Sequence, residues 1–118
     1  MITKIIEQLK TGRVKNVVPY GTHPLPAPPY VVVRTEADGL GRGRIFRIFA
    51  HFIPGQIIFL EDYIQNDLTL LLRDFEAVSR HGNRNRLFTE QDYSDIIANN
   101  DDGTISMERR FLMPSKFF

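Results

Sequence analysis

Residues 44–75 read RIFRIFAHFIPGQIIFLEDYIQNDLTLLLRDF, and the spacing of the apolar residues changes within this stretch. Between Arg44 and Phe52 the side chains alternate so that one face of an extended chain is wholly apolar, which predicts a β-strand. Beyond Pro54 and Gly55 the apolar residues recur every three or four positions, as in an amphipathic helix. The stretch therefore predicts a strand followed by a helix of about 20 residues, roughly 30 Å long.

The same spacing assigns side chains to faces. The two faces of the strand carry Phe46, Ile48, Ala50 and Phe52 on one side, and Ile45, Arg47, Phe49 and His51 on the other. The apolar side of the helix carries Ile57, Leu60, Ile64, Leu68, Leu71 and Phe75. Because only the first strand face is wholly apolar, we expect the helix to pack on Phe46, Ile48 and Phe52.

The N-terminal third predicts a short helix, a connection and a second strand. Ile5, Ile6 and Leu9 share one helical face, and this helix should end near Gly12. Residues 14–29 contain five prolines, so we expect an ordered connection without a helix or strand. Residues 30–34 are apolar and β-branched, and residues 35–43 contain three glycines, which predicts a hairpin between strands 30–34 and 44–52.

The proline segment has two interpretations. Pro26 and Pro29 form a PxxP spacing, which aromatic-lined grooves recognise in an extended conformation. However, the residue before each proline is driven toward extended geometry, and the segment continues without a break into Tyr30. We favour strand entry over a ligand motif.

The last third also leaves two interpretations. Thr89 and Asp92 resemble a helix start, although that motif normally has Glu or Gln at the second position. Residues 93–98 and 104–113, separated by a turn at Asp102-Gly103, instead suggest a second hairpin, which we favour. In its second strand one face carries Ile105, Met107, Phe111 and Met113, interrupted by Arg109.

These elements predict an α+β fold in a single domain, residues 1–118. We expect a small, mostly antiparallel sheet of about four strands, packed against one long and one short helix. A chain of 118 residues with 42% hydrophobic and 25% charged residues is ordinary for one globular domain. Cysteine is absent, the formal net charge is +1, and the sequence has no run of eighteen apolar residues, so we expect neither disulfides nor a membrane span.

Catalytic, metal and cofactor motifs are not recognisable. His23, His51 and His81 lack the spacing of a shared metal site. Aligning Gly103 with the glycine of a calcium loop places Ala98 and Arg109 at ligand positions, which excludes calcium. GLGRGR at 39–44 precedes a strand, whereas a phosphate loop precedes a helix. We therefore expect no enzyme and no cofactor; a small hydrolase around Glu61, Asp62 and Glu108 is the least favoured alternative.

Charges are sorted along the chain. Arg80, Arg84 and Arg86 lie in a segment without acids, and an acidic segment without bases follows, with Glu90, Asp92, Asp95, Asp101 and Asp102. Two solvated loops would explain this pattern equally well. Complementary patches on one chain are also what a cyclic assembly requires.

Three stretches resemble a known protein family: PLPAPPYVVV, RIFRIFAHFIPGQIIFLEDYIQNDLTLLL and DDGTISMERRFLMP, together about half of the chain. They are similar to the small tail-completion proteins of tailed bacteriophages, the tail terminators and head-tail joining proteins. This resemblance implies a structural virion protein of a phage or prophage that forms a homo-oligomeric ring, such as a hexamer, at the head-proximal end of the tail. It implies tail tube or connector proteins as partners, non-specific DNA contact in the channel, and host cytoplasm as the place of assembly.

Interface candidates follow from these observations. The alternative function is a nucleic-acid-binding module that uses the arginines of the basic loops. The candidates are Arg42, Arg44, Arg80, Arg84, Arg86, Glu90, Asp92, Asp95, Phe117 and Phe118.

Overall fold

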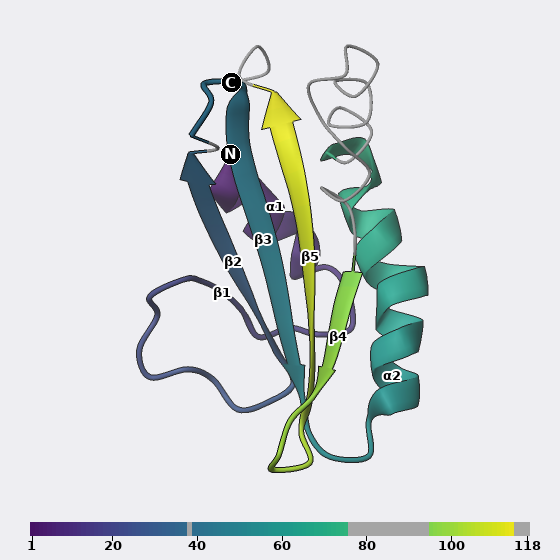
Figure 1. Ribbon diagram of the computed structural model, residues 1–118. Coiled ribbons are helices and arrows are strands. Elements are labelled where there is room, and N and C mark those ends of the chain that lie inside the picture. Colours follow the sequence, from purple (N-terminus) through teal and green to yellow (C-terminus); the bar gives the residue numbers. More distant parts are fainter. Residues whose placement is uncertain (38, 76–94, 115–118) are drawn as a thin grey trace.

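The computed structural model describes residues 1–37, 39–75 and 95–114, and it has the predicted α+β architecture (Figure 1). A short and a long helix accompany one sheet, as expected. The long helix begins at Ile57 and continues to residue 75. In chain order the elements are α1 (Ile2–Leu9), β1 (Val17–Pro19), β2 (Tyr30–Ala37), β3 (Gly43–Phe52), α2 (Ile57–Asp62), η1 (Tyr63–Leu68), β4 (Asp95–Asn99) and β5 (Ile105–Pro114).

Within the described residues the sheet has five strands in the order β1-β2-β3-β5-β4, one more than predicted. Both expected hairpins, β2–β3 and β4–β5, are confirmed, and every pair except the parallel β1–β2 pair is antiparallel. The extra strand β1 lies in the proline-containing segment, which was expected to have no element. This expectation was wrong because Pro19 ends the strand at an edge of the sheet, where its missing N–H breaks no central ladder.

The helices cover one face of the sheet, as the spacing of the apolar residues predicted. The buried strand residues Phe46, Ile48 and Phe52 form one cluster with Leu60 of α2 and Ile5 of α1. Phe52 also contacts two rings of the long helix: its centroid lies 5.7 Å from that of Phe59 and 5.9 Å from that of Tyr63. The core therefore lies between the sheet and both helices.

The long helix contains a π-helical turn, η1, which sequence spacing did not predict. Tyr63 and Leu68 are five residues apart and both fully buried. In an α-helix, positions five apart point about 140° away from each other, whereas a π-turn brings them onto one side. Leu72, four residues after Leu68, is buried on the same side. Tyr63 and Leu72 thus lie in the core although neither was predicted there, and Ile57, which was, is 36% exposed.

The second face of the sheet is packed against neither α1 nor the long helix, and we call it the open face. It carries the alternate residues of each strand, including Val32 and Arg34 of β2, Phe49 of β3, Glu108 of β5 and Ile96 of β4. Most of these side chains are half-buried or exposed. Apart from Ile45, Ser106 and Leu112, which are buried, the open face is therefore a surface on which apolar, aromatic and charged groups meet solvent together.

Candidate interaction surfaces

The structure describes three of the ten predicted interface residues. Arg42 and Arg44 lie at the tip of the β2–β3 hairpin, and Asp95 begins β4. The other seven lie outside the described residues, and they are Arg80, Arg84, Arg86, Glu90, Asp92, Phe117 and Phe118.

The basic tip and an acidic turn lie at opposite ends of the sheet. The tip is next to the start of β3, where Gly43 pairs with Pro114. The turn that joins β4 to β5 contains Asp101 and Asp102 and lies at the other end of β3, where Phe52 pairs with Ile105. Because β3 has ten residues, the two ends are separated by roughly 33 Å.

The end of the sheet that holds the β4–β5 turn is acidic beyond the turn itself. Residues 48–61 and 95–108 contain no lysine and no arginine. Within the turn, the Asp102 carboxylate accepts hydrogen bonds from the hydroxyl and the backbone N–H of Thr104, which lower the pKa of Asp102. Asp101 and Asp102 are both exposed. This end of the molecule therefore presents negative charge to solvent at neutral pH.

Asp95, a predicted interface residue, makes contacts within the chain. Its carboxylate accepts hydrogen bonds from Arg109, at 2.7 Å from Nε and 2.8 Å from Nη2. Arg109 points toward the helices and is buried, in agreement with the predicted interruption of an apolar face. Its Nη2 also donates to the hydroxyl of Thr69 at 3.2 Å. Asp95 thus ties the edge strand β4 to β5 and the helix.

Three charged side chains form a ladder across the open face. The guanidinium of Arg47 donates to Glu36 at 2.8 Å and to Glu108 at 3.3 Å, which connects β2, β3 and β5. The hydrogen bond from Arg47 lowers the pKa of Glu36. The ladder occupies the part of the open face nearer the basic tip, and aromatic residues occupy the part nearer the acidic turn.

An aromatic hollow of about 540 Å³ lies where the proline segment meets the open face. Tyr30 and Phe49 project from neighbouring strands, and Tyr20 follows β1. The guanidinium of Arg34 lies 4.5 Å from the centroid of the Tyr20 ring, a cation–π contact. The described lining residues of the hollow, which include no acid, are Tyr20, Gly21, Thr22, His23, Leu25, Tyr30, Val32 and Phe49.

Sequence reasoning identified none of these lining residues as a site. Phe49 was assigned to the second strand face, and Tyr30 to the strand entry. The available signal was that the second face of strand 44–52 combined aromatic and charged residues. What brings Tyr20 and Leu25 to the same place is the parallel pairing of β1 with β2, which was not expected.

The opposite edge of the sheet is strand β4, and all five of its residues are exposed. Ile96 is 65% exposed on the open face, and Ile97 is 45% exposed on the face that the helices cover elsewhere. The strand contains no proline, lysine or arginine, which are the residues that commonly prevent edge strands from pairing with other chains. Within the part of the chain that the structure describes, this edge therefore carries large exposed aliphatic side chains, which are typical of a contact surface.

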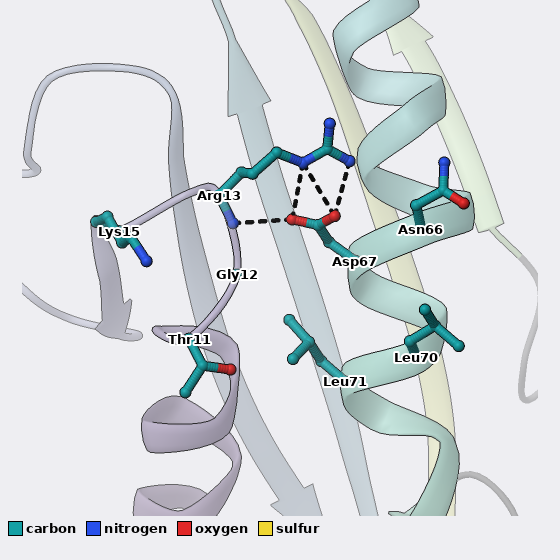
Figure 2. Close-up of a pocket in the computed structure, with 8 residues that line it drawn as sticks. All are labelled: Thr11, Gly12, Arg13, Lys15, Asn66, Asp67, Leu70 and Leu71. Atoms are coloured by element: carbon teal, nitrogen blue, oxygen red, sulfur yellow. Dashed lines mark hydrogen bonds and ion pairs between the residues drawn. The ribbon is translucent and has the colours of Figure 1, made fainter.

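A second hollow, also about 540 Å³, separates the loop after α1 from the long helix (Figure 2). There the Arg13 guanidinium donates to Asp67 at 2.7 Å from Nη2 and also pairs with Asp62. The backbone N–H of Arg13 donates to the same Asp67 carboxylate at 2.8 Å. Arg13 lowers the pKa of both carboxyl groups. Asp62 and Asp67 are five apart, so the π-turn lets one arginine bind both.

Among residues 1–37, 39–75 and 95–114 there is no group of three His, Asp or Glu side chains that could hold a metal ion. No helix within these ranges is long and apolar enough to cross a bilayer. No protein-family model matches the chain, and no curated protein matches it significantly.

Proposed function

We propose that this chain is a structural protein of a phage or prophage particle that assembles with copies of itself into a ring at the head-proximal end of the tail. The single observation that carries the proposal is that opposite sides of the molecule carry unlike surfaces. One end of the sheet is basic and the other acidic; one edge has an aromatic hollow and the other exposed isoleucines. Heterologous contacts between different patches are those from which cyclic rings are built.

The charged ends suggest how such a ring would meet two different partners. If the strands run along the axis of the ring, the Arg42 and Arg44 tips of all copies gather on one rim. The Asp101 and Asp102 turns then gather on the other rim, roughly 33 Å away. A basic rim and an acidic rim select partners of opposite charge, since complementary potentials suppress wrong pairings. Tail tube and connector proteins would bind different rims.

The native mass tests the proposed assembly. We expect light scattering after gel filtration to show, above a threshold concentration, one mass that is an integral multiple of 13.7 kDa and does not grow further. Negative-stain images of this fraction should show closed rings. A monomer at every concentration, or a mass that rises continuously as in an open filament, would contradict the proposal.

The alternative, a nucleic-acid-binding module, is favoured by one observation: Arg42 and Arg44 lie together at the tip of one hairpin. Binding through these residues should weaken with salt with a logarithmic slope of about −0.9 per neutralised phosphate. Duplex DNA should then bind less well to Arg42→Glu/Arg44→Glu than to Lys4→Glu/Lys10→Glu, which changes the net charge equally on exposed positions of α1 and its end. Equal DNA retention by the two variants would remove the tip from this role.

A further inference from the structure

We propose that the aromatic hollow receives the β4 edge of a second copy of this chain, with Ile96 as the inserted side chain. This inference rests on the proposed self-assembly and adds the surfaces through which neighbouring copies meet. The hollow and Ile96 belong to opposite edges of the same sheet, so each copy presents both halves of the contact. One copy can therefore bind a neighbour on either side.

The register of the strands places the aromatic hollow and Ile96 at the same position along the strand direction. Val32 of the hollow pairs with Phe49, Phe49 pairs with Glu108, and Glu108 pairs with Ile96. These four residues form one cross-strand row on the open face. Figure 1 shows the sheet that this row crosses, with β4 at one side and the segment between β1 and β2 at the other.

A shared level is what a closed ring requires. Heterologous contacts close into a ring when each copy is related to the next by rotation alone, and they give a helical filament when each step also includes a rise. Because Ile96 and the hollow lie in the same row, a neighbour rotated about an axis along the strands can meet the hollow without a rise. A contact between the basic tip and the acidic turn would instead shift each copy by roughly the length of β3.

The chemistry of the two surfaces also matches. Tyr20 is 65% exposed and Leu25 47% exposed beside the hollow, and Ile96 is 65% exposed, so the contact would remove apolar surface from water on both sides. Strand β1, on the hollow side, is only three residues long and ends in Pro19, which limits strand-to-strand pairing at that edge.

Cross-linking tests this contact directly, because the chain contains no cysteine and engineered thiols have no background. Leu25→Cys and Ile96→Cys are made as separate variants, both at exposed positions, then purified, mixed and treated with a short bis-maleimide. We expect a cross-linked dimer that contains one chain of each variant. As a matched control, Leu40→Cys, at a more exposed position on the hairpin tip, should give at least fivefold less product with Ile96→Cys.

A substitution provides a second readout. Ile96→Lys places a charge where the inserted side chain would lie, and it should shift the assembly to monomer while circular dichroism and urea unfolding stay as in the wild type. Ile58→Lys, at a position 77% exposed on α2, should leave the mass unchanged. Both results together support the contact.

Four outcomes would overturn the inference. A closed wild-type oligomer without the Leu25–Ile96 cross-link, or one that survives Ile96→Lys, removes this contact and leaves the proposed ring standing. Efficient cross-linking of Ile96→Cys with itself would indicate a two-fold pairing of β4 edges instead. A wild-type protein that is monomeric at every concentration removes both the contact and the proposed function.

Discussion

The carboxylate of Asp95 accepts two hydrogen bonds from the guanidinium of Arg109, one at 2.7 Å and one at 2.8 Å. Arg109 lies on the covered face of the sheet, in the row of Ile48, and it is only 5% exposed. Its contact with Thr69 adds the long helix to the same network. One buried cation therefore fixes the position of the edge strand that carries Ile96 relative to the core.

Removing one partner of this pair should be costly. Asp95→Ala removes the carboxylate that accepts two hydrogen bonds from the buried guanidinium, and we expect a loss of about 1.5–3 kcal/mol in the free energy of unfolding, as for hydrogen bonds to charged groups. The double variant Asp95→Ala/Arg109→Met removes the charge together with its partner and should recover most of this loss. Urea unfolding of the single and double variants measures the difference. If both lose equally, the ion pair is not what stabilises β4.

The stability that the ion pair between Arg13 and Asp67 contributes to the fold should depend on pH. Because Arg13 lowers the pKa of Asp67 and Asp62 in the folded state, their contribution is complete above the unfolded pKa of about 3.9. It is lost as the pH falls through the lower folded values. Asp67→Asn should therefore cost about 1–2 kcal/mol at pH 7. The difference from the wild type should shrink below about pH 4.

Urea midpoints of the two proteins between pH 7 and pH 2 measure this dependence. Asp74→Asn is the matched control, since that carboxylate is 93% exposed and lies 3.8 Å from Arg73. It should leave the midpoint unchanged at every pH. If Asp67→Asn lowers the urea midpoint by the same amount at every pH, the charge of Asp67 does not contribute to the stability of the fold.

The Tyr63 hydroxyl has no hydrogen-bond partner among the described residues, although it is fully buried. Burial also raises the pKa of this phenol. Because an unpaired buried hydroxyl is costly, Tyr63→Phe should raise the free energy of unfolding by about 1 kcal/mol. Tyr20→Phe, at an exposed position, should change nothing measurable. A destabilised Tyr63→Phe protein would indicate that the hydroxyl is satisfied by bound water.

The β4–β5 turn depends on a left-handed residue. Gly103 has φ of +86°, in the region that side chains disfavour, which matches the turn expected at Asp102-Gly103. Gly103→Ala should lower the free energy of unfolding by about 1–2 kcal/mol. Gly103→Asn should lose less, because asparagine tolerates this conformation. Thermal unfolding compares the two. Equal losses would point away from backbone strain and toward the contact with Pro54, whose Cγ would lie 3.5 Å from an added Cβ.

Local spacing was sufficient for most elements. The alternation in 44–52 predicted β3 and its covered face, and the Asp102-Gly103 pair predicted the second hairpin. Two features escaped this reasoning for the same reason. The parallel strand β1 depends on hydrogen bonds to β2, and the π-turn directs Tyr63 and Leu68 into a core formed with the strands, so each involves partners distant in sequence.

The sequence by itself determined the fold class, the two hairpins and the face on which the long helix packs, because the period of apolar residues reports which side chains leave water. Only the tertiary structure decided that Tyr20, Leu25 and Phe49 form one hollow, and that it lies level with Ile96. Positions across a sheet are set by strand order and register, and these arise from pairing between segments far apart in the chain, such as that of Gly43 with Pro114.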